Sequence, residues 1–499
     1  MGGLSLRFAS ILARMPDLVA MAPRQLQAWR DAAGLEVVGI TADSRQVRHG
    51  MIFAALPGAR HDGRSFIVQA IARGAVAILA EPGTKVGNAC KLLEDPLPRR
   101  RLAVIAALLA PPPPALLVAV TGTNGKTSTT DFLRQIWTLA GHEAASLGTL
   151  GVVTAAGEAG PGLTTPDPVG LSQTLGDLAR KGIGRAALEA SSHGLDQYRL
   201  DGLRIDAAAF TNLTRDHLDY HATMAAYRAA KLRLFAEVLS PHAPAVACTT
   251  LDDESLAGLR HIAARRRLAL RLVGEGGDAI RLLRATPRPD GQVLELEADG
   301  TRHAVALALP GRFQADNALV AAALAEATGV PDAIARLPGL VGVRGRMELA
   351  ATLPNGAAVY VDYAHTPDAL ARLLTALRPH TEGRLHIVFG AGGDRDPGKR
   401  PLMGAAVAAH ADVAIVTDDN PRTENPAAIR DAVLAGMAAL PGARTHANRA
   451  DAIAAALADL RPGDVLAVAG KGHEQGQTIG TEVFPFDDAG VVRQLAGAA

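Results

Sequence analysis

The sequence predicts an α/β protein of three domains, in which the central and C-terminal domains contain mainly parallel sheets. The length predicts three domains, because 499 residues at about 150 per domain make roughly three. Four prolines at 111–114 form a stiff linker between two periodic segments. After this linker, buried-strand patterns alternate with helical patterns, which is typical of doubly wound sheets. We expect domains at 1–110, 111–341 and 342–499.

The composition is that of an ordinary soluble enzyme, with 48% hydrophobic residues, 20% charged residues and a net charge of +1. This balance favours neither nucleic acid nor a membrane as a partner, and aromatic residues for base stacking make up only 3%. Cys90 and Cys248 lack CxxC spacing, so we expect neither a disulfide framework nor a zinc site. A reducing cytoplasm fits this pattern.

Two apolar segments could suggest a different location. The N-terminal segment is interrupted by Arg14, Pro16 and Asp17, so we expect no signal peptide. Residues 102–120 are uncharged and long enough to span a bilayer, but the prolines at 111–114 break any helix there. We predict a helix end, a linker and then a strand.

A phosphate-binding turn opens the central domain. Residues 115–120 form a buried-strand pattern, 126–140 a helical one, and Thr121-Gly122-Thr123-Asn124-Gly125-Lys126-Thr127 lies between them. Backbone N–H groups at such a helix start can hold phosphate oxygens, with Lys126 reaching the β and γ phosphates and Thr127 a Mg²⁺ ion. Val120 stands where the standard P-loop pattern has glycine, so a chance glycine turn is the alternative.

Two further side chains are predicted near this turn. Glu189 and His217 each follow an apolar strand-like run, which places them near the carboxyl edge of the same sheet. A carboxylate and an imidazole beside triphosphate are reasonable ligands for Mg²⁺. On its own, His217 would more often be a structural or surface histidine.

Lys231 lies on the apolar face of a helix predicted over 224–235, four residues after Tyr227 and four before Phe235. A buried ammonium group beside Mg²⁺ would be unfavourable, whereas a lysine carbamylated by CO₂ is an anion that can bind metal. The alternative is a lysine whose stem packs while its ammonium reaches solvent.

The third domain is predicted to be Rossmann-like, with buried strands at 385–389, 412–417 and 464–469. The loops that follow these strands meet at one sheet edge. Arg395 and Arg422 in these loops can each bind a carboxylate through two hydrogen bonds, and Glu474 can bind an ammonium group. The alternative for Arg422 is an Asn-Pro turn with a solvated arginine.

The turn GTNGKT, without the earlier glycine, resembles the Mur ligase family, which includes the folylpolyglutamate synthases. The resemblance covers nearly the whole chain and implies two metal ions held by Glu189 and His217, with Lys231 carbamylated. It implies Mg²⁺ bound by Thr127, Glu189, His217 and modified Lys231. The ATP-binding residues it implies are Gly122, Thr123, Asn124, Gly125, Lys126, Thr127, Ser128, Asn317 and Arg346. Gln314 departs from the asparagine usual in the adenosine segment.

The resemblance also implies how a nucleotide-linked peptide would bind. The first domain resembles the uridine-binding segment of the muramoyl-tripeptide synthetases, which folylpolyglutamate synthases lack. The residues implied to bind the UDP-muramoyl dipeptide are Ala42, Ser44, Ala59, Arg60 and His61, then Thr164, Thr165, Ser191, Gln197 and Arg199. The hydroxyls at 164 and 165 could equally cap a helix over 169–179.

Asp419-Asn420-Pro421-Arg422 matches the signature of the meso-diaminopimelate-adding synthetases, whereas lysine-adding members differ at the last position. The amino-acid-binding residues implied are Arg395, Asp419, Asn420, Pro421, Arg422, Gly470 and Glu474. An arginine suits this choice, because diaminopimelate differs from lysine by one distal carboxylate.

The resemblance implies an ATP- and Mg²⁺-dependent ligase that adds meso-diaminopimelate to UDP-N-acetylmuramoyl-L-Ala-D-Glu through an acyl phosphate, in cytoplasmic peptidoglycan precursor synthesis. We expect a monomer whose last domain closes before the chemical step. The nearest alternatives are an L-lysine-adding ligase and a folylpolyglutamate synthase. A P-loop switch or motor is an alternative from another class, but it would not need Lys231 or the first domain.

Overall fold

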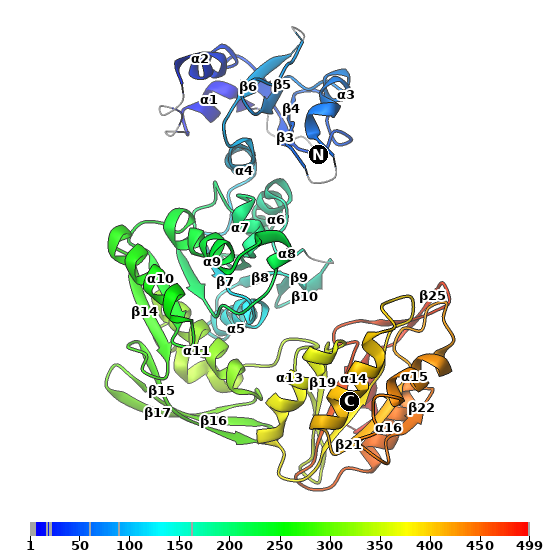
Figure 1. Cartoon of the computed structure of the whole chain (residues 1–499). Helices are drawn as coiled ribbons and strands as arrows, with labels where there is room; N and C mark the ends of the chain where they lie inside the picture. Colours follow the sequence, from blue (N-terminus) through cyan, green and yellow to red (C-terminus); the bar gives the residue numbers. More distant parts are fainter. Residues whose placement is uncertain are drawn as a thin grey trace. The chain divides into compact units, whose positions relative to one another are not determined.

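The computed structural model describes residues 6–15, 18, 22–58, 61–87, 90–160 and 163–497 (Figure 1). Contacts within the chain group it into two compact units, one of residues 1–271 with 327–329 and one of 272–326 with 330–499. This division lies inside the predicted central domain. The three main sheets occupy residues 39–94, 116–307 and 348–469, each within one predicted domain, while the boundaries at 110 and 341 stay a prediction.

The first sheet is parallel throughout and carries a small core. Its order is β3 (Gly39–Thr41), β4 (Met51–Ala54), β5 (Ala77–Ala80) and β6 (Lys91–Glu94). Trp29 is fully buried beside this sheet, stacks on Phe8 and donates from Nε1 to the Glu94 carbonyl. The surrounding elements are β1 (Leu6–Arg7), β2 (Glu36–Val37), α1 (Phe8–Leu12), α2 (Pro23–Asp31), η2 (Gly63–Phe66), α3 (Ile67–Ala72) and α4 (Pro98–Leu109).

The large sheet contains the phosphate-binding turn at its parallel centre. Its order is β10-β9-β8-β11-β7-β12-β13-β14-β15-β16-β17. The parallel strands nearest the turn are β8 (Ala144–Gly148), β11 (Arg185–Glu189), β7 (Leu116–Thr121), β12 (Ala207–Phe210) and β13 (Pro244–Cys248). The predicted helix end, proline linker and strand at 102–120 are confirmed by α4 and β7.

Antiparallel hairpins form both ends of this sheet. They contain β9 (Gly151–Thr154) and β10 (Gly157–Ala159) at one end and β15 (Ile280–Arg288), β16 (Gly291–Ala298) and β17 (Thr301–Leu307) at the other, with β14 (Ala269–Gly274) before them. The accompanying helices are α5 (Lys126–Leu139), α6 (Pro168–Arg180), α7 (Ser192–Asp196), α8 (Leu218–His221), α9 (Met224–Arg233), η3 (Leu234–Val238), α10 (Asp253–Arg266), α11 (Arg312–Ala327), α12 (Ala333–Arg336) and η4 (Leu337–Gly339).

The third sheet confirms the doubly wound prediction. Its order is β18 (Glu348–Thr352), β19 (Ala358–Asp362), β23 (Val465–Ala469), β20 (Leu385–Phe389), β21 (Val413–Thr417) and β22 (Arg444–His446), and only β18 is antiparallel. Ile387 packs with α13 (Pro367–Leu377), α14 (Lys399–His410) and α15 (Pro426–Leu434). Its neighbour Val388 packs on the other face with α16 (Arg449–Ala458) and α17 (Asp488–Leu495). η5 (Arg378–His380) and the hairpin β24 (Gly476–Ile479) and β25 (Glu482–Pro485) complete this region.

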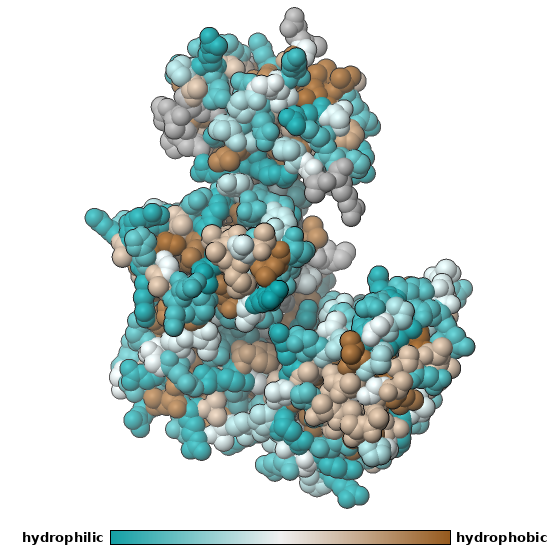
Figure 2. Space-filling model, viewed as in Figure 1, coloured by the Kyte–Doolittle hydropathy of each residue, from teal (hydrophilic) through white to brown (hydrophobic). Residues whose placement is uncertain are grey.

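The visible surface mixes hydrophilic and hydrophobic residues, with a paler brown area over the C-terminal part (Figure 2). Among the residues that the structure describes, no helix is long and apolar enough to cross a membrane.

Candidate active site

The phosphate-binding turn joins the end of β7 to the start of α5. Gly125 precedes the helix with φ of 82°, and Gly122 has φ of 150°. A Cβ atom at Gly122 would lie 1.9 Å from Thr211 Oγ1, so only glycine fits there. Lys126 Nζ donates to the carbonyls of Gly122 and Thr123 at 3.0 and 2.8 Å. The ammonium group therefore lies on the turn whose helix start suits an anion.

Glu189 ends β11, the strand next to β7, and its carboxylate contacts the turn. Thr127 Oγ1 donates to Glu189 Oε1 at 2.9 Å, and Thr149 N donates to the same oxygen at 2.9 Å. Burial raises the pKa of Glu189, while Lys126 and these hydrogen bonds act in the opposite direction. The carboxylate and hydroxyl oxygens are hard donors of the kind that Mg²⁺ prefers.

Gly148 and Thr149 also shape this site, although neither was predicted. A Cβ atom at Gly148 would lie 1.9 Å from Glu189 Oε1, so a side chain there would displace the carboxylate. Gly148 ends β8 and Thr149 follows it, and β8 pairs with β11 in parallel. Their place after a neighbouring parallel strand is the signal that could have identified them.

Lys231 is buried, as predicted, with 1% of its surface exposed. Its Nζ donates to the Gly122 carbonyl at 2.7 Å and lies 4.5 Å from the centre of the Tyr227 ring. Burial, and secondly the charge of Lys126, lowers the pKa of Lys231 to about 6. The alternative of an ammonium group that reaches solvent is therefore wrong, and at neutral pH the amine is mostly neutral.

His217 also lies near Tyr227, with 48% of its side chain exposed. Its ring centre is 6.2 Å from the Tyr227 ring and 4.9 Å from His193, and Nε2 lies 3.5 Å from Asp216. The Tyr227 hydroxyl lies 3.1 Å from Thr123 Oγ1, so this ring connects the turn with His217 and Lys231. Within the described ranges, no three His, Cys, Asp or Glu side chains form a group that could hold a metal.

The residues predicted to bind the dipeptide lie beside Glu189. Thr165 Oγ1 donates to the Glu189 carbonyl at 2.8 Å and lies 3.0 Å from Ser191 Oγ. Arg199 donates to the Thr165 carbonyl and, at 2.8 Å, to Gln197 Oε1. The structure thus joins these four residues into one hydrogen-bonded group.

Thr164 and Thr165 do not cap the following helix. Asp167 is the N-cap of α6 and accepts from the backbone N–H groups of Val169 and Gly170. Thr164 Oγ1 instead lies 3.0 Å from Thr149 Oγ1. The capping alternative is wrong, because the carboxylate nearer the helix already satisfies its first N–H groups.

In the first sheet, the predicted uridine-binding residues lie after neighbouring parallel strands. Ala42 and Ser44 follow β3, and Ser44 Oγ donates to Gln69 Oε1 at 3.0 Å. His61 lies in the turn after β4, with its ring centre 6.4 Å from that of Phe66 in an edge-to-face arrangement. Ala59 and Arg60 lie outside the described residues.

Two further predicted ATP-binding residues, Asn317 and Arg346, belong to the second compact unit. Asn317 is buried on α11, and its Nδ2 donates to Gln314 Oε1 at 3.2 Å. The unusual Gln314 therefore contacts the predicted purine-binding residue directly. The guanidinium of Arg346 lies 5.2 Å from the Tyr363 ring.

The predicted amino-acid loops follow β20, β21 and β23, which are neighbours in the third sheet. Asn420 Nδ2 donates to Glu474 Oε2 at 3.0 Å, which joins the β21 and β23 loops. Arg422 is half-buried, and its Nη1 donates to the Gly393 carbonyl at 2.8 Å, so the guanidinium contacts the β20 loop. Pro421 lies between these residues, Gly470 opens the β23 loop, and Arg395 is exposed in the β20 loop.

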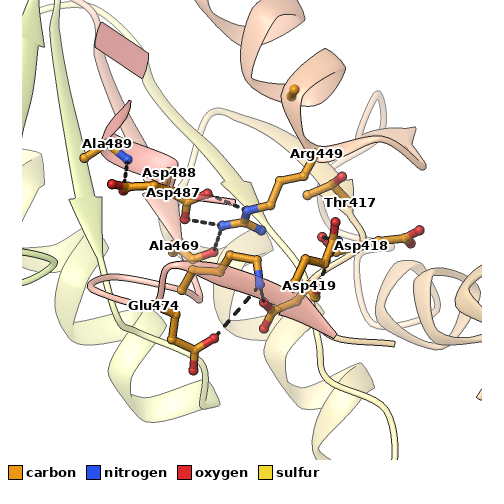
Figure 3. Close-up of polar contacts among 12 residues, drawn as sticks. Thr417, Asp418, Asp419, Arg449, Ala469, Glu474, Asp487, Asp488 and Ala489 are labelled. Carbon is orange, nitrogen blue, oxygen red and sulfur yellow. Dashed lines mark hydrogen bonds and ion pairs between the residues drawn. The ribbon is translucent and has the colours of Figure 1, made fainter. Parts of the chain in front are cut away.

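The structure contains two buried cations in this region for which we predicted no role from the sequence. Lys471 lies in the β23 loop, and Arg449 starts α16. Lys471 is fully buried and lies 3.3 Å from Asp419 Oδ1. Arg449 makes two 2.7 Å hydrogen bonds to Asp488 and donates to the Ala469 carbonyl at the end of β23 (Figure 3). The only sequence signal for Lys471 is its place between Gly470 and Gly472 after a strand.

Models of three domains match this chain in order. They are "Mur ligase family, catalytic domain" over residues 36–108, "Mur ligase middle domain" over 120–325 and "Mur ligase, glutamate ligase domain" over 345–472. A solved structure of Mycobacterium tuberculosis folylpolyglutamate synthase has a TM-score of 0.57 at 20% identity over 80% of this chain and 95% of that chain, which shows the shared fold.

More similar relatives share the name UDP-N-acetylmuramoyl-L-alanyl-D-glutamate–2,6-diaminopimelate ligase. The Caulobacter vibrioides protein is 52% identical, covering 91% of this chain and 94% of its own. The Bradyrhizobium diazoefficiens protein is 50% identical, with coverage of 91% and 94%. A solved structure with this name is 32% identical, covers 99% of both chains and has a TM-score of 0.75. The chain therefore belongs to the Mur ligase family of ATP-dependent, amide-bond-forming ligases.

Proposed function

We propose that this ligase adds meso-diaminopimelate to the D-Glu γ-carboxylate of UDP-N-acetylmuramoyl-L-Ala-D-Glu. The observation that carries the proposal is the pairing of Asn420 with Glu474 beside Arg422, which offers a carboxylate for an ammonium group and a guanidinium for a carboxylate. Diaminopimelate presents both groups at its distal end, whereas lysine presents only the ammonium. The names of the relatives at about 50% identity support the same substrate pair.

The reaction we propose begins with transfer of the γ-phosphoryl group of ATP to the D-Glu carboxylate, which gives an acyl phosphate. Lys126 and the backbone N–H groups at the start of α5 stabilise the phosphate charge. The group of Thr165, Ser191, Gln197 and Arg199 orients the acceptor peptide beside them. The diaminopimelate amine then attacks the acyl carbon, and phosphate leaves.

Mg²⁺ fits the donor set of the phosphate site. Thr127 and Glu189 supply adjacent oxygens, and we propose that His217 and carbamylated Lys231 complete the set. The buried amine of Lys231, with its pKa lowered to about 6, is mostly neutral at pH 7 and can add CO₂ with loss of a proton. The ions would neutralise charge on the phosphates when bound. We further propose a cytoplasmic monomer that serves peptidoglycan precursor synthesis.

Phosphate release from the purified protein tests the ligase mechanism. We expect phosphate release to require ATP, the UDP-muramoyl dipeptide and an amino acid together. The acyl phosphate forms only on the bound carboxylate, and phosphate leaves when the amine of the amino acid attacks the acyl carbon. Omission of each component in turn provides the controls. Rapid ATP hydrolysis without the dipeptide would instead favour a P-loop switch or motor.

A further inference from the structure

Lys471 lies in the loop after β23, among the proposed amino-acid-binding residues, and its ammonium group makes two hydrogen bonds and one close ion pair. Its Nζ donates to Asn420 Oδ1 and to the Gly476 carbonyl at 2.9 Å each, and it lies 3.3 Å from Asp419 Oδ1. The side chain is 0% exposed. An ammonium group has three donors and no acceptor, so two of its N–H groups are satisfied by these hydrogen bonds, and the nearby Asp419 carboxylate balances its charge. Lys471 is thus held inside the site and does not face solvent.

The contact with Asn420 determines which way that amide faces. Lys471 Nζ and the backbone N–H of Thr478 both donate to Asn420 Oδ1, the latter at 2.9 Å. Two donors require the oxygen on that side, so Nδ2 must face the opposite way. There it donates to Glu474 Oε2 at 3.0 Å. Asn420 therefore links the buried ammonium group of Lys471 to the carboxylate of Glu474 through two hydrogen bonds.

Glu474 gains a fixed position from this arrangement. Its side chain is 36% exposed, so the carboxylate held by Asn420 also reaches the open side of the loops. Lys471 Nζ is 4.0 Å from Glu474 Oε2, beyond hydrogen-bonding distance, whereas Asn420 bonds to both residues. Lys471 therefore acts on Glu474 in two ways, by its charge 4.0 Å away and through the Asn420 amide, which alone supplies a directed hydrogen bond.

We propose that Lys471 is a positioning residue for amino-acid specificity, which fixes the amide of Asn420 so that Glu474 is held to receive the distal ammonium of the substrate. This inference rests on the proposed amino-acid site. It adds a role for a buried residue that contacts Asn420 and Asp419 of that site. Its consequence is that loss of Lys471 should weaken recognition of one functional group and leave ATP and nucleotide-peptide binding unchanged.

The test compares meso-diaminopimelate with 2-aminopimelate, which keeps the distal carboxylate and lacks the distal ammonium. In Lys471→Met, whose side chain has a similar length and no charge, we expect the ratio of kcat/KM for diaminopimelate to that for 2-aminopimelate to fall about tenfold. This is the size expected when a hydrogen bond to a charged group is lost. KM for ATP should stay unchanged. An equal loss for both substrates would mean a merely structural role and would overturn the proposal.

Two further variants separate the possible failures. Glu474→Gln should lower the same ratio, and if it does not, the proposed amino-acid site itself is wrong. If Glu474→Gln lowers the ratio while Lys471→Met does not, only the positioning role fails. Asn420→Asp keeps acceptors for Lys471 but cannot donate to Glu474, so it should lower the ratio even if Lys471→Met folds poorly. An unchanged ratio in Asn420→Asp would also overturn the proposal.

Discussion

At the phosphate site, Lys231 is buried where its charged form is poorly stabilised. The folded protein lowers its pKa to about 6, whereas an unfolded chain keeps the ordinary value near 10. Between these values the unfolded chain binds the proton more tightly. Stability should therefore rise with pH across this window and fall as the pH drops toward 6.

Lys231→Met should be more stable than the wild type at pH 7, because it removes the buried amine. It should also be inactive as a ligase, because it cannot form the proposed carbamate. Its advantage should shrink as the pH rises, by up to about 1.4 kcal/mol per pH unit. Thermal unfolding at pH 7 and pH 9, in buffers without CO₂ or Mg²⁺, measures this difference. It can be followed by tryptophan fluorescence, to which Trp137 on α5 and Trp29 both contribute. The exposed Lys181→Met is the matched control. A stability difference that does not vary with pH, or full ligase activity of Lys231→Met, would contradict the account.

Arg422 is the residue expected to distinguish diaminopimelate from lysine. Arg422→Ala should lower kcat/KM for meso-diaminopimelate by at least roughly thirtyfold, because a buried carboxylate–guanidinium pair is typically worth about 2–5 kcal/mol. L-lysine lacks the distal carboxylate and should lose much less. Exposed Arg461→Ala serves as the control. Equal losses for both amino acids would mean that Arg422 only supports the loop through its bond to Gly393.

Site residues could be predicted from the sequence where they lie at or just after the end of a predicted strand. Glu189 ends β11, and Thr127 lies just after the neighbouring parallel strand β7. The structure places Thr127 Oγ1 2.9 Å from Glu189 Oε1. Lys471 and Arg449 were not predicted, because their partners lie far along the chain. Arg449 and Asp488 are 39 positions apart, and Lys471 and Asn420 are 51 positions apart. No local pattern contains such pairs.

At the level of elements, the Arg449–Asp488 pair joins the start of α16 to α17 and to the end of β23. Both side chains are fully buried. Such a pair leaves an uncompensated charge in the interior when one partner is removed. The loop that carries Lys471 and Glu474 begins at this point.

Arg449→Met should therefore destabilise the C-terminal region by about 3–5 kcal/mol, and Arg449→Met/Asp488→Leu should recover much of the loss. Both tryptophans, Trp29 and Trp137, lie in the first compact unit, so hydrogen exchange of the β23 amides is the suitable measurement. Exposed Arg461→Met provides a matched control. A loss below about 1 kcal/mol in Arg449→Met would be the range of a surface pair and would contradict this role.

The elements themselves were predicted best where the apolar pattern is continuous. The strands expected at 385–389, 412–417 and 464–469 match β20, β21 and β23 within one residue. The helix expected over 224–235 continues past Arg233 as the π-helical segment η3. Strands β15 to β17 were not predicted, although the alternation of buried and exposed residues in β16 is a strand signal that could have identified it.

For the whole molecule, the three-domain α/β class was predictable because length, a proline linker and alternating patterns all indicate it. The division into two compact units was not, because it depends on contacts among segments far apart in the sequence. The proposed site residues are distributed over both units, so we expect activity to require both of them.

The most direct test of the central claim is a competition assay with the purified full-length protein. With ATP, Mg²⁺ and UDP-N-acetylmuramoyl-L-Ala-D-Glu, equal concentrations of meso-diaminopimelate, L-lysine and L-glutamate are offered together, and the products are identified by mass. We expect the diaminopimelate adduct to predominate and its formation to match phosphate release one to one. A predominant lysine adduct would overturn the assigned specificity, and phosphate release without any adduct would contradict the ligase mechanism.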